Sequence, residues 1–158
     1  MATPTIGYPR EVDNSANPTP ARLRALPSWV INQTAIAANR LTDRALADTG
    51  SRRYHFAMLL ALDEFGPSSQ ADLGRCTGID RSDVVAAVNA MVERGFLQRS
   101  PDPADGRRKI VTLTSAGKDH LKSLSALLAD AQNELLHALS PAESKTIVDL
   151  LTRVLDSR

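Results

Sequence analysis

The chain of 158 residues has little of what several classes of protein require. It has one cysteine, so no disulfide can form within a chain, which favours a reducing compartment. Aromatic residues make up only 4%, and the apolar residues are mostly Ala, Leu and Val, which favours helices over a β-sandwich. No apolar run approaches the roughly 20 residues that span a bilayer, and the N-terminus lacks the features of a signal peptide. We therefore expect a cytoplasmic protein without a membrane span.

An excess of charge of one sign is also lacking. The formal net charge is +1, so the composition alone does not indicate nucleic acid as a partner. Basic residues slightly outnumber acidic ones between Gln70 and Lys118, and the balance reverses from Asp119 onward. This distribution is compatible with a DNA-facing middle of the chain but does not establish one.

Patterns of catalytic and metal-binding residues are missing as well. The sequence has no nucleophile elbow, phosphate-binding loop or paired-carboxylate motif. Its three histidines, His55, His120 and His137, are scattered, and no Cys, Asp or Glu joins them at a metal-ligand spacing. We expect no enzymatic activity, no catalytic residue, no cofactor and no metal.

The first 27 residues contain five prolines, which interrupt any helical or strand period. We expect residues 1–27 to form an irregular Pro-rich N-terminal arm. Two interpretations remain open: a disordered tail, and an arm that wraps around a partner subunit.

The remainder, residues 28–158, has the pattern of a mainly α domain. Polar residues suited to helix N-caps precede apolar residues at helical spacing. The expected N-caps are Ser28, Ser69, Asp80, Thr114 and Ser140. The expected helices cover residues 28–48, 53–65, 70–76, 81–94, 114–139 and the segment from 141 onward. Strands are expected only at 96–100 and 109–113, joined by a turn-rich loop into a hairpin.

The helix expected at 70–76, the turn at Thr77 and Gly78, and the helix from Arg81 have the order of a helix-turn-helix. In that motif the second helix enters the major groove. Its period points Val84, Val88 and Met91 inward. The outward residues are small or polar: Arg81, Ser82, Val85, Ala86 and Asn89. Arg81 has the fork that pairs with guanine, and Asn89 the amide that pairs with adenine. A helix face that contacts only solvent has the same pattern, so a solvated helix remains the alternative interpretation.

A basic cluster follows the loop of the hairpin. Arg107, Arg108 and Lys109 come directly after a turn of Pro, Asp and Gly. A projecting loop of this kind can place an arginine in the narrow minor groove. A solvated basic turn is the alternative interpretation.

Three stretches, residues 78–82, 91–97 and 102–117, closely resemble the MarR family. The most specific part is an Asp-x-Arg wing followed by Leu-Thr-x-x-Gly. It is present as Asp105, Arg107, Leu113, Thr114 and Gly117. The resemblance covers about residues 28–156. It implies a winged helix-turn-helix over about 53–114, with a small β-hairpin as the wing, and a helical dimerisation region formed by about 28–49 and 115–156.

The resemblance also implies a function and roles for residues. It implies a homodimeric transcriptional regulator, usually a repressor, that binds a pseudo-palindromic operator in double-stranded DNA and is released by a small ligand. Arg107 would contact DNA and Asp105 would hold the wing in shape. The alternative function is a winged-helix protein-interaction or dimerisation module without DNA-binding activity.

Five residues belong to elements that meet near the effector pocket in the family. They are Trp29, Arg52, Arg53, Tyr54 and His55. A small aromatic or phenolic acid would fit such a pocket, with Arg52 or Arg53 as its anion partner, whereas ordinary core and surface positions are the alternative.

Cys76 is expected to be a buried structural thiol, because the relatives that sense peroxides carry their cysteine in the first helix of the domain.

Overall fold

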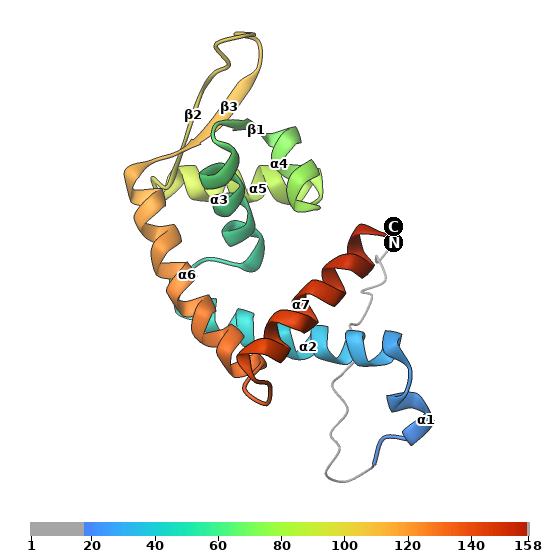
Figure 1. Ribbon diagram of the computed structural model, residues 1–158. Coiled ribbons are helices and arrows are strands. Elements are labelled where there is room, and N and C mark those ends of the chain that lie inside the picture. The colour runs from blue at the N-terminus through green and yellow to red at the C-terminus, as the bar shows by residue number, and fades with distance from the viewer. Residues whose placement is uncertain (1–17, 158) are drawn as a thin grey trace, which may run out of the picture. The chain divides into compact units, whose positions relative to one another are not determined.

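The computed structural model describes residues 18–157, which divide into two compact units (Figure 1). One unit comprises residues 18–42 and 131–157, and the other comprises residues 43–130. Most of the predicted N-terminal arm, residues 1–17, lies outside the described residues. The fold is mainly helical with one small antiparallel sheet, as the sequence predicts.

The first unit corrects the prediction for the end of the arm. Residues 21–24 form a short helix, α1 (Ala21–Arg24), and α2 (Pro27–Leu46) begins at Pro27, so Ser28 is not its N-cap. Proline suits these positions because its φ is already helical and its missing N–H would have no partner in a first turn. The Pro20 carbonyl accepts hydrogen bonds from the amides of Leu23, at 3.0 Å, and Arg24, at 3.1 Å.

The helix α7 (Pro141–Asp156) also belongs to the first unit, and it starts as predicted. The Ser140 hydroxyl accepts a hydrogen bond from the Glu143 amide at 3.3 Å, and the Glu143 carboxylate accepts one from the Ser140 amide at 2.8 Å. Apolar side chains of α7 are nevertheless exposed, including Leu150 and Leu155, the latter by 67%. On α2, Val30 and Ile31 are exposed as well.

The second unit contains the helix-turn-helix and the hairpin. Its elements are η1 (Ala47–Thr49), α3 (Arg53–Phe65), β1 (Ser68–Ser69), α4 (Gln70–Thr77), α5 (Arg81–Glu93), β2 (Leu97–Pro101), β3 (Lys109–Leu113) and most of α6 (Ser115–Leu135). The strands pair antiparallel in the order β1-β3-β2. The sequence pattern does not predict β1, because two residues are too few to show a strand period. The predicted end of α6 at residue 139 is wrong, since the helix ends at Leu135.

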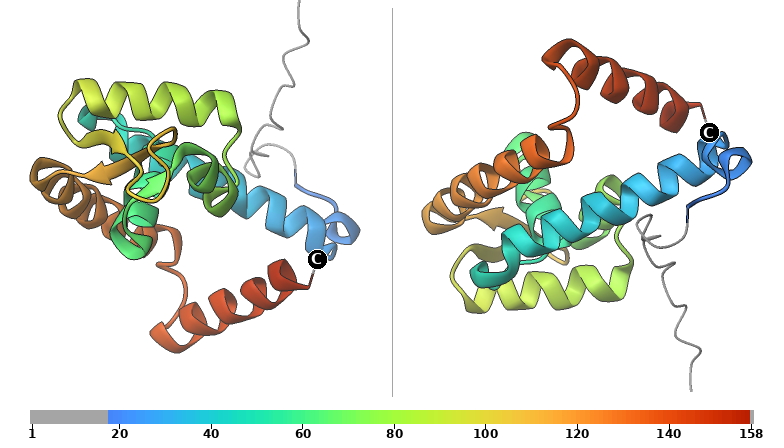
Figure 2. Two further views of the ribbon diagram at one scale, coloured as in Figure 1. Left: turned by 90° about the horizontal axis from the view of Figure 1, so that it is seen from above. Right: turned by 90° about the horizontal axis from the view of Figure 1, so that it is seen from below.

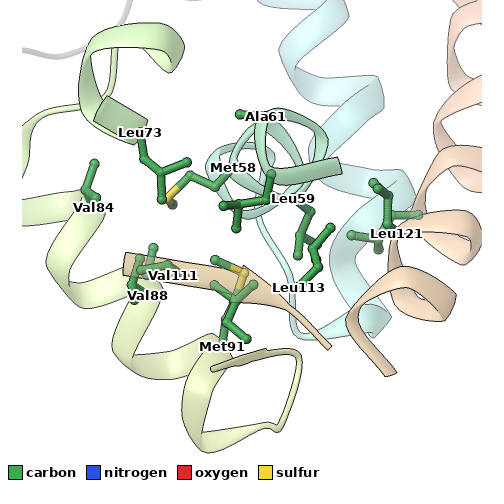
Figure 3. Packing of buried hydrophobic residues seen from close by; sticks show 14 of the residues in the cluster. Met58, Leu59, Ala61, Leu73, Val84, Val88, Met91, Val111, Leu113 and Leu121 are labelled. Carbon is green, nitrogen blue, oxygen red and sulfur yellow. The ribbon is translucent and has the colours of Figure 1, made fainter. Parts of the chain in front are cut away.

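The core of this unit lies between α3, α4, α5 and the sheet (Figure 3). Met58 and Leu59 of α3 and Leu73 of α4 are fully buried. The inward stripe predicted for α5 is confirmed, since Val84, Val88 and Met91 are at most 1% exposed; Ala87 joins them. This burial fixes which side of α5 faces solvent.

Of the two N-caps predicted for the helix-turn-helix, the one on α4 forms and the one on α5 does not. The Ser69 hydroxyl accepts a hydrogen bond from the Asp72 amide at 3.1 Å and caps α4. Gly78, with a φ of 68°, ends α4 in the left-handed conformation that glycine tolerates. Asp80 stands at the predicted N-cap position of α5, but its side chain makes no capping hydrogen bond there.

The Leu-Thr-x-x-Gly segment has a clear structural role at the start of α6. The Thr114 hydroxyl accepts a hydrogen bond from the Gly117 amide at 3.0 Å and donates one to the Gly95 carbonyl at 2.7 Å. A Cβ on Gly117 would overlap the Phe96 carbonyl and lie 3.0 Å from Leu113 Cδ2. Glycine therefore allows α6 to start directly against the turn that leads into β2.

Candidate nucleic-acid interface

The outer face of α5 is exposed along its length, and the helix forms a straight edge of the second unit (Figure 2). The five residues predicted to point outward are all exposed: Arg81, Ser82, Val85, Ala86 and Asn89. Four of them have small or uncharged side chains, so other groups can approach the helix closely. The face has the shape and chemistry that the major groove accepts.

The hairpin of β2 and β3 projects from the helices of the second unit (Figure 1). Two aspartates shape its tip. The Asp102 carboxylate accepts a hydrogen bond from the Ala104 amide at 2.9 Å, and the Asp105 carboxylate accepts one from the Arg107 amide at 3.1 Å. These are local turns in which an aspartate side chain replaces a backbone acceptor.

The three basic residues of the wing look equivalent in the sequence, but their side chains have different contacts in the structure. All three are exposed, but Arg108 Nη2 lies 3.7 Å from Asp72 Oδ2 and Arg108 Nη1 lies 4.0 Å from Asp102 Oδ2. Arg108 therefore turns toward α4. Within residues 18–157 no hydrogen bond or ion pair holds the side chains of Arg107 or Lys109. Their charges remain available to a partner.

Arg99 on β2 also belongs to this surface, although the sequence pattern does not predict it. Its exposed guanidinium donates from Nη2 to the side-chain oxygen of Asn89 on α5. The available signal was its position two residues after the buried Leu97, which places both on the same face of the strand. The hairpin and α5 are thus linked through their side chains.

The residues predicted for an effector pocket are divided between the two units. Arg52 to His55 are consecutive at the start of α3, whereas the half-buried Trp29 belongs to the other unit. Arg53 Nε donates to Asp43 Oδ1 at 2.9 Å on the surface. Tyr54 meets the His55 ring edge to face, with ring centres 4.5 Å apart.

His55 is buried. Its Nδ1 accepts a hydrogen bond from the Arg52 amide at 3.0 Å, so the neutral ring carries its proton on Nε2. Burial, followed by the nearby charges of Arg94 and Arg52, lowers the pKa of His55 to about 4. Burial also lowers the pKa of His120. Both rings are neutral near pH 7.

A chain of contacts anchors the C-terminal end of α5. Arg94 donates to the Gly50 carbonyl at 2.9 Å and to the Thr49 carbonyl at 2.8 Å, and its guanidinium lies 4.6 Å from the centre of the Phe96 ring. Phe96 stacks on His120 at 4.1 Å, and His120 Nε2 lies 2.8 Å from the Ser51 hydroxyl. Local patterns could not reveal these contacts between residues far apart in the chain.

Cys76 is exposed, so the prediction of a buried structural thiol is wrong. The helix α4 buries only Leu73, and a side chain in its last turn lies beyond the core. Across residues 18–157 the structure has no group of three or more His, Cys, Asp or Glu placed to hold a metal ion. No helix in that part of the chain is long and apolar enough to cross a membrane.

The helix pair, the exposed second helix and the three-stranded sheet with a projecting hairpin define a winged helix-turn-helix. Residues 49–108 match the model of the MarR family. The transcriptional repressor NicR of Pseudomonas putida is 34% identical over 102 residues, which are 65% of this chain and 65% of NicR. The chain belongs to the MarR family.

Solved structures of other proteins match this chain over longer stretches. A "probable transcriptional regulator" from Pseudomonas aeruginosa is 33% identical, with a TM-score of 0.75, and the match covers 84% of this chain and 99% of that one. BpsR of Bordetella bronchiseptica is 25% identical, with a TM-score of 0.77, and the match covers 87% and 99%. The named relatives are regulators rather than enzymes.

Proposed function

We propose that this protein is a dimeric transcriptional repressor that binds operator DNA through α5 and the β2–β3 wing and is released by a small ligand. One observation carries the proposal: the small and polar outer face of α5 lies beside a wing whose Arg107 has no partner within the described residues. NicR, by its name, is a transcriptional repressor.

The two elements divide the work of binding. Arg81 lies at the first position of α5 and can reach a base edge, with Ser82, Val85, Ala86 and Asn89 lining the groove. Arg107 and Lys109 supply positive charge from the wing. Arg108 adds a third positive charge, and its Nη2 also lies 3.7 Å from Asp72 Oδ2 of α4. Asp105 supports the wing by accepting the hydrogen bond from the Arg107 amide.

Dimerisation follows from apolar surface that one chain leaves exposed. Large apolar side chains on α7 and the start of α2 are accessible, which a single chain tolerates poorly. We propose that the helices at about 28–49 and 115–156 form a two-fold interface, and that residues 1–27 form an arm outside this domain. A dimer of this kind binds a pseudo-palindrome with half-sites about 10 base pairs apart.

The ligand that we propose is a small aromatic or phenolic acid. DNA binding by BpsR is regulated by 6-hydroxynicotinic acid, and PcaV from Streptomyces coelicolor has been solved in complex with its natural ligand. For this chain the candidate residues are Trp29, Tyr54 and His55, with Arg52 or Arg53 as the partner of the carboxylate. We propose no enzymatic activity, and a cytoplasmic location, where the DNA is.

A gel-shift experiment with DNA flanking its own gene tests this function. We expect a discrete complex at nanomolar protein, competed by unlabelled specific DNA and not by random DNA, and weakened by a set of aromatic acids that includes 6-hydroxynicotinic acid. Footprinting would show two protected half-sites. A protein that shifts no DNA from this region, while remaining folded and dimeric, would instead be an interaction module.

A further inference from the structure

We propose that Asn89 and Arg99 act as a single base-reading unit that recognises guanine, in place of the adenine expected for Asn89 alone. The inference rests on the proposed function and specifies its recognition chemistry. Its starting point is the hydrogen bond from Arg99 Nη2 to Asn89 Oδ1, which joins strand β2 to the recognition helix α5.

The position of Arg99 follows from the register of the sheet. Leu97 and Arg99 lie on the same face of β2, because alternate residues of a strand share a face. Leu97 is 2% exposed, and Val111, which pairs with Arg99 on β3, is fully buried. The Arg99 side chain therefore leaves the strand on the side that packs against α5 and emerges beside Asn89, past the edge of the core.

The pair presents hydrogen-bond donors. A guanidinium has five N–H donors and no acceptor, so the Asn89 atom that faces Arg99 has to be Oδ1. Both N–H groups of the Asn89 amide then have no partner within residues 18–157, and the residue is exposed. Within residues 18–157 no carboxylate pairs with Arg99, and its remaining donors are not taken up by an ion pair.

The donor pattern selects the base. Adenine offers an acceptor at N7 and a donor at N6, so an asparagine that reads adenine needs its oxygen for the N6 amino group. Here one of the two lone pairs of that oxygen is taken by Arg99, and the guanidinium brings further N–H donors beside it, so the adenine amino group would face donors rather than a free acceptor. Guanine offers two acceptors, N7 and O6, which match two outward donors.

The site is separate from that of Arg81. Asn89 lies eight residues after Arg81 on the same exposed face, which is about 12 Å along a helix. The two side chains therefore face different base pairs. Arg81 and the Asn89–Arg99 pair specify different positions of each half-site.

The test uses the full-length protein and an operator selected from a random duplex library. Binding is then measured on operators that carry each of the four base pairs at every position. We expect a preference for guanine at one position, on the order of 10- to 100-fold, that Asn89→Ala and Arg99→Ala each abolish. The double variant should be no worse than either single variant at that position, because the two side chains act together.

Two further variants separate base reading from charge and from stability. Arg99→Lys keeps the charge and the salt dependence but loses the planar fork, so the guanine preference should fall. Asn89→Asp keeps an acceptor for Arg99 and removes the amide donors, so the preference should fall while thermal melting stays unchanged. Gln98→Ala, on the exposed opposite face of β2, is the control and should keep the wild-type preference.

Three results overturn this inference alone: a preference for adenine at the position, effects of the two single variants at different positions, or a uniform loss of affinity in Arg99→Ala with a shallower salt dependence. The last result would make Arg99 a phosphate contact. A wild-type protein that enriches no sequence overturns the proposed function, and this inference with it.

Discussion

At the scale of single residues, side chains that look equivalent in the sequence differ in what they can reach. Arg107 and Arg108 are adjacent, yet Arg108 is held near two carboxylates and Arg107 is not. Helical spacing identified the outward residues of α5 because it is a local property. The pairing of Asn89 with Arg99 depends on two elements meeting, so no local pattern could predict it.

The roles of Arg107 and Arg81 should be separable by salt titration. Arg107→Ala should weaken binding to operator and random DNA alike and make the salt dependence shallower by up to about one unit of slope, because it removes a charge contact. Arg81→Ala should cost roughly 1–3 kcal/mol per half-site and relax the preference at one base pair. Neither variant should change the melting temperature, since both side chains are exposed. An Arg107→Ala protein with unchanged affinities and slope would show that the wing does not contact DNA.

His55 makes stability depend on pH. Its pKa is about 4 in the folded protein and 6.5 in an unfolded chain, so between these values only the unfolded chain binds the proton. Stability is therefore highest above pH 6.5 and falls as the pH drops toward 4, by an amount on the order of 1–3 kcal/mol. The lowered pKa of His120 acts in the same direction.

Urea unfolding at several pH values between 7 and 4 measures this effect. His55→Asn, whose side-chain oxygen can replace Nδ1 as the acceptor for the Arg52 amide, should show a shallower loss of stability than the wild type. Equal pH dependence of the two proteins would contradict the assignment to His55.

At the scale of elements, the junction between β2, β3 and α6 depends on the close approach of Gly117 to the Phe96 carbonyl. Thr114 caps α6 and also bonds the Gly95 carbonyl, while Gly117 leaves room for the Phe96 carbonyl. The cap was predictable from the sequence, because it involves residues three apart. The need for glycine was not, because it arises from a backbone atom that is distant in the chain.

Gly117→Ala should destabilise the protein, although alanine normally favours a helix. The added methyl group would collide with the Phe96 carbonyl, and overpacking of this kind costs about 1–3 kcal/mol. Thermal melting measures the effect. Gly106→Ala is the matched control, because nothing lies within 4 Å of its Cβ position. A Gly117→Ala protein that is as stable as the wild type, or more so, would contradict the observed packing.

At the scale of the whole molecule, the exposed apolar side chains of α2 and α7 indicate dimerisation. Light scattering at micromolar concentration should give twice the 17.0 kDa mass of one chain. The interface should bury roughly 2,000 Å² or more in total. Leu150→Lys should shift the protein toward monomer without unfolding it, because Leu150 is already 51% exposed in a single chain.

Thr152→Lys provides the matched control for that experiment. It adds the same charge to α7 at an exposed position outside its apolar stripe, so the mass should remain that of a dimer. A wild-type protein that is monomeric at micromolar concentration, or a Leu150→Lys variant that remains fully dimeric, would argue against an interface on α7.

By itself, the sequence determined the parts of this protein that depend on neighbours within about four residues. Helical period, N-caps such as Ser69 and Ser140, and the turn-rich wing predicted the order of the helices, the hairpin and the face of α5 that meets solvent. Backbone hydrogen bonds in helices and turns are local, and their preferences can be read from short segments.

Only the tertiary structure decided the contacts that join elements. It placed Arg94 on the carbonyls of Thr49 and Gly50, exposed Cys76, and paired Arg99 with Asn89. It also added β1 to the sheet, although Ser68 and Ser69 are too few to signal a strand. These features depend on which surfaces the packed core brings within hydrogen-bond distance, and that distance is set by the whole fold rather than by any one segment.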